Sequence, residues 1–140
     1  MNIETQLRQL GIDPASPRVT IGKAVGDIEG KPPKRKSRSD GYKSKWESLY
    51  ALELAGRRQA GDIEWWAYEP ISLVIVAAGG KRCHYTPDFL IVQQGWFTFT
   101  EVKGYLRESA RIRFLAAKER YPFWRFEMIR RTRSGWEQIL

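Results

Sequence analysis

The sequence predicts an α+β fold in which helices flank a central mixed or antiparallel β-sheet. Two stretches with helical spacing, about residues 41–60 and 106–120, enclose a run of segments rich in β-branched and aromatic residues. Turn signals interrupt that run at residues 79–80, both glycine, and at residues 94–95, Gln-Gly. A chain of 140 residues has room for a single core of ordinary size. We therefore expect one folded domain.

The first forty residues differ in composition from the rest. Ile3, Leu7 and Leu10 recur at helical spacing and predict a short helix in the first ten residues. Prolines, glycines and charged residues dominate the next thirty positions, which offer little to bury. We expect residues 1–40 to form a basic, largely flexible N-terminal arm, and residues 41–140 to form the folded domain. A short strand at residues 19–21 that pairs only in an assembly is the alternative for part of this arm.

The first long helix is predicted over residues 41–60. Trp46, Tyr50 and Leu54 fall at i, i+4 and i+8, which places them on one face turned toward the core. Gly61 follows as a stop signal. Glu47 lies beside this apolar face, so we expect its carboxylate to reach the sheet.

The middle of the chain is predicted to be a series of strands. Five short segments combine β-branched and aromatic residues and are separated by turn signals. They cover residues 63–68, 72–77, 81–85, 89–93 and 97–103.

A second helix is predicted over residues 106–120, before Pro122, and a last strand over residues 123–130. In this helix we expect Ile112, Leu115 and Ala116 to face inward. Its basic residues then lie along another side, at Arg107, Arg111 and Lys118.

The net charge of +8 indicates a polyanionic partner, and its distribution is uneven. Residues 1–46 hold ten Lys/Arg and five Asp/Glu, residues 47–104 hold five and seven, and residues 105–140 hold nine and four. An acidic centre therefore lies between two basic flanks. A surface that only bound a polyanion would not need that centre, whereas a site that holds a cation against a polyanion would.

Composition also excludes several classes of protein. No apolar run approaches the roughly 20 residues that a membrane span requires, and the N-terminus has no apolar signal segment. A single cysteine, Cys83, excludes an internal disulfide framework and a cysteine-built zinc site. We expect a soluble, cytoplasmic protein without a membrane partner.

The main chemical signal is a pair of carboxylates on two neighbouring strands. If Gln94 and Gly95 form a two-residue hairpin turn, Leu90 lies opposite Phe99 and Asp88 lies opposite Glu101. Like charges at directly opposed positions repel each other, with Cβ atoms roughly 4.5–5.5 Å apart. A divalent cation between them removes the conflict, and carboxylate oxygens suit Mg²⁺ or Mn²⁺.

Lys103 follows Glu101 by two residues, so strand alternation places both on one face. A metal held by two carboxylates can activate a water for attack on a phosphodiester, while a nearby ammonium stabilises developing charge. Glu47 on the first helix is the candidate for a further acidic group, and Glu53 is its alternative. His84 is either a proton carrier near this site or, more simply, a structural or surface residue.

This pattern resembles the PD-(D/E)xK nuclease signature. Pro87 and Asp88 are followed by twelve residues and then by Glu101, Val102 and Lys103. The string Tyr-Thr-Pro-Asp-Phe-Leu over residues 85–90, with the basic helix after residue 104, is similar to the phage endonuclease I branch, which resolves Holliday junctions. The resemblance covers about residues 41–130.

The resemblance implies a restriction-endonuclease-like core and a Mg²⁺-dependent DNA endonuclease, with Mn²⁺ able to replace Mg²⁺. Asp88, Glu101 and the Val102 carbonyl would bind the metal, Lys103 would assist the attacking water and Glu47 would complete the site. The implied substrate is branched DNA, the implied assembly a homodimer and the implied source a phage or prophage. The long basic N-terminal arm departs from that branch.

Two other functions remain open from the sequence. One is cleavage of transposon ends or of DNA in general by a protein of the same superfamily. The other is DNA binding without catalysis on a degenerate nuclease fold. The basic residues are candidates for contact with DNA phosphates, and the alternatives are a solvated tail for those before residue 40 and the water-facing side of an amphipathic helix for those after residue 105. The candidates are Lys34, Arg35, Lys36, Lys43, Lys45, Arg107, Arg111 and Lys118.

Overall fold

The computed structural model describes residues 5, 6, 8, 40–76 and 78–140 and has an α+β fold. The predicted N-terminal helix lies mostly outside the described residues, and the predicted strand at residues 19–21 lies wholly outside them. The elements, in chain order, are α2 (Lys45–Gln59), β1 (Trp65–Tyr68), β2 (Leu73–Val76), the short 3₁₀ turn η1 (Ala78–Gly80), β3 (Arg82–Tyr85), β4 (Phe89–Gln93), β5 (Trp96–Val102), α3 (Glu108–Arg120), β6 (Arg125–Thr132) and β7 (Gly135–Gln138).

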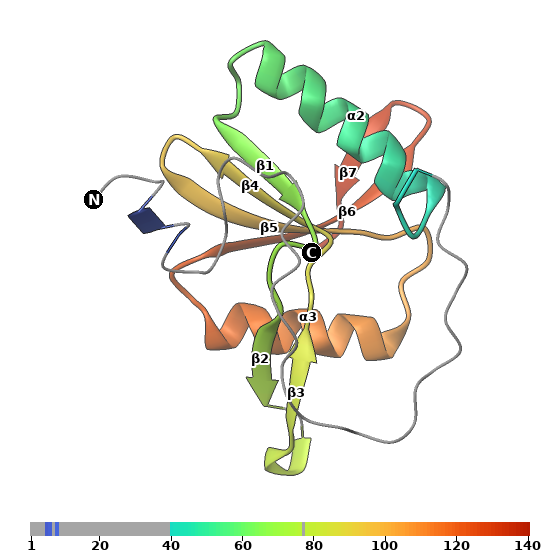
Figure 1. The fold of residues 1–140 in the computed structure, drawn as a ribbon. Helices are drawn as coiled ribbons and strands as arrows, with labels where there is room; N and C mark the ends of the chain where they lie inside the picture. The colour runs from blue at the N-terminus through green and yellow to red at the C-terminus, as the bar shows by residue number, and fades with distance from the viewer. Residues whose placement is uncertain (1–4, 7, 9–39, 77) are drawn as a thin grey trace.

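Five strands form one mixed sheet in the order β1-β4-β5-β6-β7. β5 and β6 are parallel, whereas the other three neighbouring pairs are antiparallel. Parallel neighbours need a crossover connection, and α3 supplies it between β5 and β6. α2 covers one face of this sheet, while α3 and the β2–β3 hairpin lie on the other (Figure 1). The predicted α+β class with a mixed sheet is confirmed at this level.

The β4–β5 hairpin has the predicted register. Leu90 pairs with Phe99 and Gln93 with Trp96. Gln94 and Gly95, the two turn residues, have φ angles of +51° and +77°. Positive φ at both positions is what a type I′ turn requires, and this turn matches the twist of the two strands. The pairing ends at Phe89 and Thr100, one position before Asp88 and Glu101.

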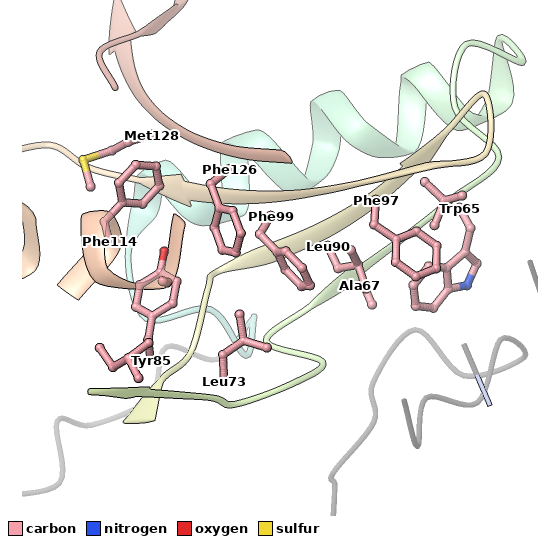
Figure 2. Packing of buried hydrophobic residues seen from close by; sticks show 13 residues of the cluster. Trp65, Ala67, Leu73, Tyr85, Leu90, Phe97, Phe99, Phe114, Phe126 and Met128 are labelled. Atoms are coloured by element: carbon pink, nitrogen blue, oxygen red, sulfur yellow. The ribbon is translucent and has the colours of Figure 1, made fainter. Parts of the chain in front are cut away.

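The larger hydrophobic core lies between the sheet and α3. Figure 2 shows Phe126, Phe99 and Leu90 in a row along one face of the sheet, with Phe114 of α3 and Tyr85 of β3 near the Phe126 end of this row. Phe99 and Phe126 stack with ring centroids 5.2 Å apart, and Phe114 meets Phe126 edge to face. These aromatic contacts hold the crossover helix against the strands that carry the candidate site.

A second core lies on the opposite face, beneath α2. Tyr50, Ala51 and Leu54 of this helix are buried against Phe89 and other apolar residues of the sheet. Successive residues of β4 alternate between the two cores, as strand geometry requires. A strand with cores on both faces has no polar side, and all but the last residue of β4 are buried.

The inward face of α3 differs from the prediction. Phe114 and Ala117 are its buried residues, whereas Ile112 and Leu115 are exposed and Ala116 is only half-buried. Apolar residues occur at five of the six positions from 112 to 117, so the pattern fits several faces of the helix. The large aromatic ring of Phe114 buries the most area, and it sets the orientation.

Three further details differ from the sequence prediction. Trp46 is 40% exposed instead of inward, and its indole lies beside Gly104, after β5. β2 and β3 form a separate two-stranded sheet. β7 was not predicted, since it is a short, largely polar edge strand without alternation.

Among the described residues, neither α2 nor α3 is long enough and apolar enough to cross a membrane.

Candidate functional site

Two carboxylates meet where β4 begins and β5 ends. Asp88 directly precedes β4, and Glu101 is the last residue but one of β5. Because the two strands are antiparallel neighbours, the start of one lies beside the end of the other. Each of these two residues is only 7% exposed. We call Asp88 and Glu101 the carboxylate pair.

Each member of the carboxylate pair is held by the protein. The backbone N–H of Val102 donates a 2.8 Å hydrogen bond to Oδ2 of Asp88. The Tyr85 hydroxyl donates a 2.9 Å bond to Oε2 of Glu101. The Lys103 ammonium lies 2.6 Å from Oε1 of Glu101, so Lys103 is on the same side as Glu101, as strand alternation predicts. The positions of both carboxylates are thereby fixed.

Burial and neighbouring charges shift the pKa values of Asp88 and Lys103. Burial, and next the charge of Glu101, raise the pKa of Asp88 well above its ordinary value. Lys103 and the Val102 N–H oppose this rise without cancelling it. Burial alone would lower the pKa of Lys103, but the carboxylates of Glu101 and Asp88 raise it, so this ammonium stays charged.

Glu47 approaches the site from the first turn of α2. The Ser44 hydroxyl accepts the N–H of Glu47 at 3.1 Å and caps the helix. Oε2 of Glu47 in turn accepts the Lys43 N–H at 3.0 Å and the Tyr68 hydroxyl at 2.6 Å. This arrangement is a variant of a capping box. It caps the start of α2 and also holds the Glu47 carboxylate in its inward position.

Glu47 is 7% exposed, whereas Glu53 is exposed on the same helix. The charge of Glu47 also contributes to the raised pKa of Asp88. The geometry therefore favours Glu47 over Glu53 as the helix acid near the carboxylate pair.

Tyr85 and Tyr68, which orient Glu101 and Glu47, were not identified from the sequence. Burial raises the pKa of both tyrosines, and the neighbouring glutamates raise it further, so both hydroxyls keep their protons as donors. Tyr85 lies only three residues before Asp88, which is a local signal. Tyr68 is 21 residues from Glu47, and only the folded chain brings them together.

The predicted DNA-contacting residues fall into separate groups. Arg107 lines a hollow of about 360 Å³ together with Glu47 and Lys103. Lys118 lines a different hollow beside Arg125, so the two are not neighbours around one site.

Three other predicted DNA contacts lie on the described surface. Lys45 is exposed at the start of α2. The ammonium of Lys43 is paired with Glu69, and Arg111 is paired with Glu108 at 3.3 Å. Lys34, Arg35 and Lys36 lie outside the described residues. His84 is exposed in β3.

The carboxylate pair offers a metal two carboxylate donors, from Asp88 and Glu101. Among the described residues, no three His, Cys, Asp or Glu side chains gather as a metal-binding group. Mg²⁺ is commonly held by one or two carboxylates, with waters and substrate phosphates as its other ligands. Asp88 and Glu101 match that requirement, and the Val102 carbonyl remains a predicted third ligand.

Comparison of the chain with protein-family models, with curated proteins and with solved structures gives no match.

Proposed function

We propose that this chain is a Mg²⁺-dependent DNA endonuclease of the PD-(D/E)xK kind, acting on branched DNA. The observation that carries the proposal is the buried carboxylate pair with Lys103 on Glu101, in a chain of net charge +8. Two buried acids side by side destabilise a fold unless a cation offsets their repulsion. Their presence in a basic protein is explained by a metal that acts on a bound polyanion.

Each residue of the site has a distinct part in the proposed reaction. Asp88 and Glu101 would hold the divalent ion, which supplies charge to polarise the phosphodiester and to lower the pKa of an attacking water. Lys103 places an ammonium beside the carboxylate pair, where it can stabilise negative charge that develops on phosphate oxygens. Tyr85 and Tyr68 keep Glu101 and Glu47 in position. None of these roles requires a covalent enzyme intermediate.

DNA as the polyanion is supported by where the positive charge lies. The segments before residue 47 and after residue 104 each carry a net charge of +5, and Arg107 borders the hollow that Glu47 and Lys103 also line. Phosphate contacts from lysine and arginine supply sequence-independent affinity for DNA. The basic flanks therefore suit a role in holding the backbone near the acids.

The test incubates the full chain with a four-way junction, a duplex of matched sequence and the single strand, each with Mg²⁺ or with a chelator. We expect cleavage that requires the metal and is fastest on the junction. Equal cleavage of junction and duplex would support general DNA cleavage by the same site. Absence of metal-dependent cleavage on every substrate would overturn the enzyme proposal and leave DNA binding alone.

A further inference from the structure

The hollow beside the carboxylate pair has an aromatic wall that the proposed chemistry does not use. It lies between the start of α2 and the segment that joins β5 to α3. Trp46 contributes from α2, and Tyr105 and Arg107 contribute from the joining segment. Glu47 and Lys103 line the same hollow, so the aromatic wall is continuous with the candidate active site.

Trp46 is held in place although it is partly exposed. Its indole lies against Gly104, where a Cβ atom would come within 3.2 Å of both Cδ1 and Nε1 of the ring. Glycine at this position therefore lets the ring lie close to the backbone. With 40% of Trp46 and 80% of Tyr105 exposed, two aromatic side chains reach solvent immediately beside Lys103.

The chemistry of this hollow matches one nucleotide more closely than a paired helix. Aromatic surface accepts the flat face of a base, while Lys103 and Arg107 offer positive charge to its phosphate. Inside a duplex both faces of each base are covered by its neighbours, so an unpaired base can stack on a side chain without the cost of unstacking a paired step. Branch points, bulges and flaps supply such bases.

We infer that the hollow binds an unpaired nucleotide next to the phosphodiester to be cut, with its base stacked on Trp46 and its phosphate at Lys103 and Arg107. This inference rests on the proposed function and extends it, since it gives a physical basis for selecting DNA that contains unpaired bases. Trp46 is then a specificity-determining residue.

Trp96 provides the matched control. It is a second exposed tryptophan, 50% accessible, at the opposite end of β5 from Glu101. The guanidinium of Arg125 lies 4.5 Å from the centre of its ring and covers one face. Replacement of Trp96 removes as much aromatic surface as replacement of Trp46 but leaves the hollow intact.

The experiment measures the Kd of the full chain, in chelator, for a duplex with a three-thymidine bulge and for the same duplex fully paired. We expect Trp46→Ala to weaken binding of the bulged duplex by about 5- to 150-fold, the range measured for loss of one base–aromatic stack. Binding of the paired duplex should change little. Trp46→Phe should retain most of the preference, and Trp96→Ala should leave it unchanged.

Loss of affinity for both duplexes by the same factor, or no loss for either, would overturn the inference. Thermal melting of each variant shows whether it is folded. Trp46→Phe tests the nucleotide site with a smaller structural change than Trp46→Ala. The outcome is separable from the proposed function. Metal-dependent cleavage without the Trp46 preference would refute only the nucleotide site, whereas the preference without cleavage would refute only the nuclease.

Discussion

At the level of single residues, the carboxylate pair places two acidic groups next to each other in a buried position. Asp88 and Glu101 are buried next to each other and are only partly offset by Lys103, the Val102 N–H and Tyr85. The fold therefore carries an electrostatic cost at one point, and this cost should be measurable in the metal-free protein.

Asp88→Asn should stabilise the metal-free protein at neutral pH. The folded pKa of Asp88 is raised, so the unfolded chain releases this proton first as the pH increases. The free energy of unfolding of the natural protein should therefore fall as the pH rises from about 4 through the raised pKa, relative to the variant. Asparagine can still accept the Val102 N–H, so the hydrogen bond is kept. The measurement is denaturant unfolding at a series of pH values in chelator.

Asp62→Asn is the control for this pH series. Asp62 is exposed and pairs with Arg57 at 2.6 Å, so its replacement should bring no gain in stability at neutral pH. A pH-independent difference between Asp88→Asn and the natural protein would contradict the electrostatic account of the pair.

Glu47 and Glu53 give a second matched comparison, within one helix. Glu47→Gln should reduce the rate of DNA cleavage by about 10- to 100-fold, the usual cost of disturbing the groups around a metal site. Glu53→Gln should leave the rate unchanged, because this side chain is exposed. Single-turnover cleavage rates with Mg²⁺ test both. Equal rates for the two variants would remove Glu47 from the site.

At the level of elements, the sequence predicted what local rules determine. The bounds of β4 and the register of the β4–β5 hairpin were correct because the Gln94-Gly95 turn sets both. The orientation of α3 was wrong because its apolar residues surround much of the helix. The pairing of β2 with β3 as a separate sheet depends on packing against α3, which no local pattern reports.

The attachment of α3 should depend chiefly on Phe114. This ring is fully buried between the sheet and the helix, so Phe114→Ala should lower the free energy of unfolding by about 3–5 kcal/mol. Phe123→Ala should cost far less, since Phe123 is 64% exposed just beyond the same helix. Urea denaturation measures both, and similar costs for the two would show that α3 is not held by this core.

At the level of the whole molecule, the candidate site was predicted in part. Asp88, Glu101 and Lys103 belong to one hairpin, so strand geometry was enough to predict that they lie together. The bond between Tyr68 and Glu47 joins elements far apart in the chain, and Trp46 lies beside Gly104, which is also distant in the sequence. Such long-range contacts follow from tertiary packing, which a single sequence does not report.

Variants in the basic segment before residue 40 test how the proposed DNA substrate is bound. If Lys34, Arg35 and Lys36 each contact a phosphate, neutralising all three should reduce the slope of log K against log salt by about 2.7 on the B-DNA scale. Fluorescence anisotropy over a range of salt concentrations measures this slope. An unchanged slope would show that these residues make no phosphate contact.

Replacement of Asp88 separates DNA cleavage from DNA binding. Asp88→Asn and the control Asp62→Asn are compared with the natural chain for cleavage of a four-way junction in Mg²⁺ and for junction binding in chelator. We predict that Asp88→Asn loses cleavage by about 100-fold or more and binds as well or better, because a negative charge facing the phosphates is gone. Asp62→Asn should match the natural chain. Full cleavage by Asp88→Asn, or a parallel loss of cleavage and binding, would contradict the assignment of Asp88 to a metal-dependent active site.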